Sequence, residues 1–103
     1  MATMKENIQY IARHYGYDAQ ARQLTEEMAE LIVALNKEWR ARIGDPTIDK
    51  GEVRKRIIEE LADVEIMIEQ IKYLYDCDYE VFTEKIRKTD RQVERMKASG
   101  DTV

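Results

Sequence analysis

The chain has 103 residues, which fits a single domain over residues 1–103, and its 37% of charged residues with only four glycines and one proline favours helices. The formal net charge of −4 argues against a general nucleic-acid surface, and no apolar run is long enough to span a membrane. Because Cys77 is the only cysteine and the N-terminus lacks an apolar signal core, we expect a cytoplasmic protein.

The first half of the chain predicts two helices. The first is expected over about 5–15, where Gly16 can take the left-handed conformation that ends a helix. The second is expected over about 18–43, with Asp18 as its N-cap. The sequence Gly44-Asp45-Pro46 should end it, because proline disfavours a helical residue before it.

The second half predicts two more helices. Asp49 and Glu52 have the spacing of a capping box for a third helix that runs to about residue 75. Asp78 is the expected N-cap of the fourth. We therefore predict an all-α, four-helix, bundle-like unit with two long central helices.

The fourth helix carries an apolar seam with spacings of three and four residues, typical of packing along other helices. Its members are Tyr79, Phe82, Ile86, Thr89, Val93 and Met96. The second helix also has apolar residues off its main arc, at Val33 and Trp39. One small four-helix chain cannot easily cover all these faces, so we expect at least a homodimer.

Acidic residues occur twice where a helix should be apolar. The first stretch is Glu26-Glu27-Met28-Ala29-Glu30, and the second is Glu59-Glu60-Leu61-Ala62-Asp63. Successive helical residues turn by about 100°, so acids three apart share a face, and here those faces reach the apolar arcs. An unpaired buried carboxylate is costly, so converging carboxylates predict a cation between them, and oxygen ligands suit Mg²⁺. A solvated acidic face is the simpler alternative.

The paired pattern resembles the EExxE…ExxD signature of the all-α nucleoside triphosphate pyrophosphatases, the MazG-like group. The resemblance runs from His14-Tyr15-Gly16 to Arg95 and includes Leu61-Ala62-Asp63-Val64 around the second motif. It implies an enzyme that hydrolyses a nucleoside triphosphate (NTP or dNTP) to the monophosphate and pyrophosphate. It also implies Mg²⁺ as cofactor, with Mn²⁺ able to substitute, and a homodimer or homotetramer. Cleaning of the nucleotide pool is a role that would follow.

The resemblance also implies roles for single residues. The implied metal ligands are Glu27, Glu30, Glu60 and Asp63. Glu26 would support the site and help to orient the attacking water. Lys88 and Arg91 match a Lys and an Arg that bind phosphates, although Ile86-Arg87 stands where the family commonly has an Asn before the Lys. By position on the second helix, Gln20 and Gln23 are candidate contacts to the nucleoside.

Two other classes remain open. A non-enzymatic helical interaction module would carry the acids on a solvated face and use the apolar seam for assembly. A carboxylate-bridged di-iron bundle needs Glu-x-x-His pairs, and the one histidine, His14, lies near neither acidic stretch. Tight, site-specific binding of Mg²⁺ or Mn²⁺ would separate the enzyme from the interaction module.

Overall fold

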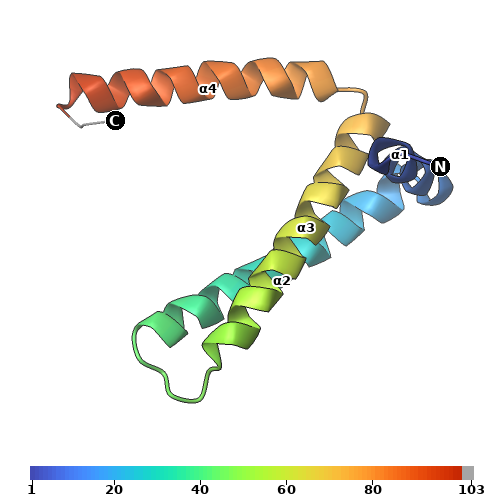
Figure 1. Cartoon of the computed structure of the whole chain (residues 1–103). Helices are drawn as coiled ribbons and strands as arrows, with labels where there is room; N and C mark the ends of the chain where they lie inside the picture. Colours follow the sequence, from blue (N-terminus) through green and yellow to red (C-terminus); the bar gives the residue numbers. More distant parts are fainter. Residues whose placement is uncertain (101–103) are drawn as a thin grey trace.

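The computed structural model describes residues 1–100, which form four helices joined by short connections (Figure 1). The helices are α1 (Met4–Tyr15), α2 (Tyr17–Arg42), α3 (Lys50–Leu74) and α4 (Asp78–Ala98). No strand occurs among the described residues. The predicted all-α class with four helices is therefore confirmed, and α2 and α3 are the two long helices that the sequence predicted.

The ends of α1 and α2 follow from a threonine and a glycine. Thr3 caps α1 by accepting a hydrogen bond from the Glu6 backbone N–H at 3.1 Å. Gly16 ends α1 as predicted, with φ of 86° and ψ of 170°; this positive φ suits glycine, but the ψ is not that of the left-handed helical conformation that we expected. The prediction of Asp18 as N-cap is wrong, because Gly16 takes that position and α2 already begins at Tyr17.

The start of α3 agrees with the sequence prediction, and the start of α4 does not. Asp49 Oδ1 accepts a hydrogen bond from the Glu52 backbone N–H at 3.1 Å, which is the Asp49 half of the expected capping box. At α4 the N-cap is Cys77, so the prediction of Asp78 as cap is wrong. Asp78 instead lies 3.3 Å from the Lys72 ammonium group, which links the start of α4 to the end of α3.

The core of residues 1–100 runs along the α2–α3 pair with one residue from α1, and half of its apolar members are alanines, whose small side chains let helices approach closely. The buried apolar residues are Ala12, Ala34, Ala41, Val53, Val64 and Met67. A polar pair is buried with them, because the Gln20 amide donates to Gln70 Oε1 at 2.6 Å. Since α2 and α3 run in opposite directions, this pair places the acidic stretch of α2 opposite that of α3.

The last helix extends away from the rest of the chain. In Figure 1, α4 leaves the end of α3 and points away from the α2–α3 pair, after a turn in which Asp76 has φ of 51°. None of the residues of α4 is buried, and the Tyr79 and Phe82 side chains are 72% and 57% exposed. The apolar seam predicted for this helix is therefore largely open to solvent in the single chain.

Candidate metal centre

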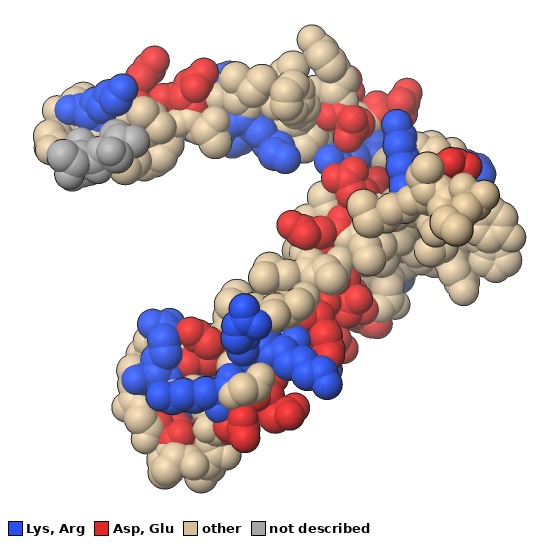
Figure 2. Space-filling view, viewed as in Figure 1, with Lys and Arg blue, Asp and Glu red and all other residues tan. Residues whose placement is uncertain are grey.

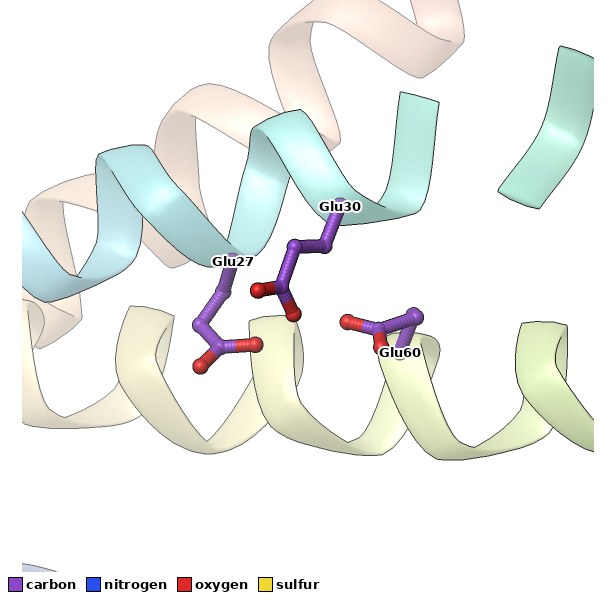
Figure 3. Close-up of side chains that lie close together, drawn as sticks. All are labelled: Glu27, Glu30 and Glu60. Atoms are coloured by element: carbon purple, nitrogen blue, oxygen red, sulfur yellow. The ribbon is translucent and has the colours of Figure 1, made fainter. Parts of the chain in front are cut away.

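Three of the predicted carboxylates meet between α2 and α3. Glu27 and Glu30 come from α2 and Glu60 from α3, and one carboxylate oxygen of each lies within 4.8 Å of the other two. Figure 3 shows the three side chains in the space between the two helices, with their carboxylates turned toward one another. We call these residues the carboxylate triad.

Burial leaves part of the triad without hydrogen-bond partners. Glu60 is only 2% exposed, and no group among residues 1–100 donates to its Oε2 or to the buried Oε2 of Glu27. Burial raises the pKa of Glu60 above its ordinary value, and the nearby acids add to this effect. The other oxygen of Glu27 accepts a hydrogen bond from the Gln23 amide at 2.8 Å, which holds this side chain in place.

One cation lies against the triad. Arg56 Nε is 3.0 Å from Glu60 Oε1, and Arg56 Nη2 is 3.8 Å from Glu30 Oε2. This guanidinium opposes the rise in the pKa of Glu60. Arg56 was not among the predicted site residues, although its position four residues before Glu60 on one helix predicts such a contact.

The triad has the chemistry of a site for a hard divalent cation. Its ligands would be carboxylate oxygens, which Mg²⁺ and Mn²⁺ prefer, and they come from two packed helices rather than from a loop. The unpaired oxygens of Glu27 and Glu60 are the groups that a cation would satisfy. Glu27, Glu30 and Glu60 are therefore the residues that fit the predicted Mg²⁺.

Two further acids expected at the site lie outside the triad. Asp63 is exposed on α3, one turn beyond Glu60, and its charge adds to the rise in the pKa of Glu60. Glu26 is also exposed, directly before Glu27 on α2. Neither residue belongs to the cluster of three carboxylates, so a role for either remains a prediction.

The two glutamines have structural partners. Gln20 is buried and its amide is used by Gln70, so it is not open to a nucleoside in this chain. Gln23 supports Glu27. A spacing argument cannot reveal such partners, because Gln70 lies on another helix, fifty positions further along the chain.

The predicted phosphate-binding pair lies on α4, and the structure does not bring it to the triad. Lys88 and Arg91 act on Glu84 of the same helix, where Arg87 and these two cations lower the pKa of the Glu84 carboxyl. The charged groups that influence Glu60 are Arg56, Glu30, Glu27 and Asp63. Contact between Lys88 or Arg91 and a phosphate at the triad therefore remains a prediction.

A cavity of about 610 Å³ adjoins the triad on the side of the loop between α2 and α3. Glu30 and Arg56 form the wall that it shares with the triad, and Lys37, Ile48 and Val53 line it further toward the loop. Its volume is in the range of small-molecule sites. No signal in the sequence predicted this cavity, because its walls come from two helices and a loop.

No protein-family model, curated protein or solved structure matches the chain. Within residues 1–100, no helix combines the length and the apolar character needed to cross a membrane. Any function therefore has to be inferred from the geometry of the triad and its surroundings.

Proposed function

We propose that the protein hydrolyses a nucleoside triphosphate to the monophosphate and pyrophosphate in a reaction that depends on Mg²⁺. The observation that carries this proposal is the carboxylate triad, in which buried oxygens of Glu27 and Glu60 lack partners. The two acidic stretches that supply the triad are those that resemble the signature of the MazG-like pyrophosphatases. A substrate with several phosphates suits such a site, because Mg²⁺ commonly binds through carboxylates together with phosphate oxygens.

Each residue has a defined part in this proposal. Glu27, Glu30 and Glu60 hold the cation, and Gln23 keeps the Glu27 carboxylate in position. The bound Mg²⁺ would supply neutralisation of the phosphate oxygens and activation of water. Glu26 and Asp63, which are exposed and close in sequence to members of the triad, would orient the water that attacks the α-phosphorus or accept its proton. Lys88 and Arg91 would have to come from a second copy, because α4 points away from the triad of its own chain.

A screen for pyrophosphate release tests the proposal. The purified protein is incubated with each common and damaged NTP and dNTP in Mg²⁺, and released pyrophosphate is measured. We expect release from at least one substrate class, stoichiometric with monophosphate, and its loss in EDTA. Release of inorganic phosphate instead, or no release from any substrate, would contradict the proposal.

A non-enzymatic interaction module is a second candidate, and the exposed seam of α4 favours it. Tyr79, Phe82 and Ile86 are large apolar side chains that residues 1–100 leave largely exposed. In that case the acids of the triad need no cation, and binding of Mn²⁺ would be weak and equal in variants of Glu60. Saturable Mn²⁺ binding that Glu60→Gln abolishes would exclude this candidate as the full explanation.

A further inference from the structure

Arg56 links two features that are otherwise separate, the carboxylate triad and the cavity beside it. Its guanidinium contacts Glu60 and Glu30 at 3.0 Å and 3.8 Å, and the same side chain lines the cavity. Figure 2 shows Lys and Arg side chains gathered over the loop end of the α2–α3 pair, next to acidic side chains. The basic residues of this end, in or beside the two helices, are Lys37, Arg40, Arg42, Lys50, Arg54, Lys55 and Arg56.

Arg56 neutralises the negative charge of the triad only in part. One guanidinium lies against two of the three carboxylates, and an oxygen each of Glu27 and Glu60 stays buried without a partner. A divalent cation between the carboxylates would satisfy these oxygens and would compete with Arg56 for Glu60. The Arg56 side chain is 55% exposed, so it has room to turn away from Glu60.

After displacement from Glu60, the Arg56 guanidinium would contact an anion in the cavity that it lines. Lys37 lies two helical turns beyond Glu30 on α2, on the same face, and lines the cavity together with Arg56. A guanidinium binds phosphate oxygens in a bidentate fashion, and a nearby ammonium adds a second positive charge. The volume of about 610 Å³ admits a polyphosphate with part of an organic group.

We propose that Arg56 is a displaceable counter-ion: it balances Glu60 in the absence of a divalent cation and, when a cation binds the triad, contacts a polyphosphate in the cavity beside Lys37. The naming of that polyphosphate as a triphosphate rests on the proposed function. The role of Arg56 itself needs only a divalent cation and an anion of several phosphates, so both can be tested without turnover.

The proposal predicts effects of opposite sign when Arg56 is replaced. In Arg56→Gln the internal competitor is gone, so Mn²⁺ should bind about fivefold more tightly, within the usual range of coupling between sites. Inorganic tripolyphosphate, added as its Mn²⁺ complex to the Mn²⁺-saturated protein, should bind at least about fivefold more weakly. A purely structural role for Arg56 would weaken both, because a distorted site loses affinity for every ligand.

Free Mn²⁺ is measured by electron paramagnetic resonance, and tripolyphosphate binding by calorimetry. Lys55→Gln is the matched control, since it removes an adjacent exposed charge that does not line the cavity, and it should change neither affinity beyond the effect of net charge. Lys37→Gln should weaken tripolyphosphate binding and leave Mn²⁺ binding as in the wild type. Arg56→Lys keeps the charge but loses the bidentate guanidinium, so it should bind Mn²⁺ about as the wild type does and tripolyphosphate more weakly.

The outcomes separate this inference from the proposed function. Weaker or unchanged Mn²⁺ binding in Arg56→Gln would overturn the inference, as would unchanged tripolyphosphate binding. If Arg56→Gln does not fold, unchanged tripolyphosphate binding in Arg56→Lys would overturn it. If the two affinities change in opposite directions but no nucleotide yields pyrophosphate, the counter-ion role stands and the proposed function fails. If pyrophosphate is released and the affinities for Mn²⁺ and tripolyphosphate are the same in Arg56→Gln as in the wild type, the proposed function stands and the inference fails.

Discussion

At the scale of single residues, Glu60 is the group on which the candidate site depends most. It is the most buried member of the triad and has an oxygen without a partner. Glu60→Gln keeps the shape of the side chain and removes a charge from the cation site, so we expect pyrophosphate release to fall by on the order of a hundredfold or more. Glu59→Gln is the matched control, since Glu59 is exposed and outside the triad, and should be nearly normal. A Glu60→Gln variant with wild-type turnover would show that the site is assigned incorrectly.

The raised pKa of Glu60 also predicts how stability depends on pH when no cation is bound. A carboxyl with a raised pKa holds its proton in the native state at pH values where the unfolded chain has released it. In EDTA, the free energy of unfolding should therefore fall as pH rises from the ordinary carboxyl range through the raised pKa. Glu60→Gln cannot lose a proton, so its melting temperature should exceed that of the wild type by a margin that grows with pH. A margin that is constant from pH 4 to pH 8 would contradict this.

Residue patterns identified the acids of the site but not their partners. Glu27, Glu30 and Glu60 could be predicted, because acids at helical spacing on an apolar side are unusual and the structure brings them together. Gln20 was assigned to a nucleoside because it lies on the same side of α2, whereas it is buried against Gln70. The partner of a buried polar group is fixed by the register between two helices, and a spacing within one helix carries no information about it.

At the scale of helices, the sequence predicts a boundary well where a residue has one possible role. Gly16 and Asp49 were assigned correctly, because a left-handed φ and a side-chain cap are requirements that few residues meet. Asp18 and Asp78 were assigned as caps on residue type alone. Gly16 and Cys77 take the cap positions instead. Each aspartate lies in the first turn of its helix, where its negative charge interacts favourably with the helix dipole.

The cap of α3 gives a prediction for one helix. Asp49 accepts the Glu52 backbone N–H at the end of the loop that joins the two long helices. Asp49→Ala should cost about 1 kcal/mol of stability, as other N-cap losses do. For a domain of this size, that lowers the melting temperature by about 4–8 °C. Asp49→Asn keeps an acceptor for this hydrogen bond and should therefore retain most of the wild-type stability. Thermal unfolding followed by circular dichroism would measure both, and equal melting temperatures for all three proteins would show that the cap contributes nothing.

At the scale of the whole molecule, binding of a cation to the triad should stabilise the fold. A ligand that binds only the native state contributes roughly 2.7 kcal/mol at a hundred times its dissociation constant. Millimolar Mg²⁺ or Mn²⁺ should thus raise the melting temperature by several degrees more than NaCl of equal ionic strength. In the double variant Glu27→Gln, Glu60→Gln this rise should disappear, and the variant should be more stable than the wild type in EDTA because the repulsion is relieved. Identical responses to Mg²⁺ and NaCl would mean that the triad is an ordinary acidic cluster.

The direction of α4 is the part of the fold that the sequence predicts least. Its seam indicated packing along another helix, but the residues that it packs against can belong to the same chain or to another copy. In the structure, α4 is joined to α3 by a short turn and by the contact between Lys72 and Asp78, and its large side chains Tyr79, Phe82 and Ile86 are exposed. Heptad spacing specifies a face and not its partner, so the sequence alone could not place this helix.

The exposed seam gives the last prediction, which concerns assembly. A helix with apolar residues along one face and no buried residue gains little from folding alone, since burial of that face supplies most of its stability. Val33 and Trp39 on α2 are also more than half exposed, so a second copy would cover apolar surface on α2 as well as on α4. We expect light scattering to give the mass of a homodimer or homotetramer at micromolar concentration.

Phe82→Glu should shift the mass toward a monomer while α1, α2 and α3 stay folded, because Phe82 lies outside their core. Gln92→Glu adds the same charge next to the seam and should leave the assembly intact. A wild-type protein that stays monomeric at micromolar concentration would contradict the prediction that a second copy covers the apolar face of α4.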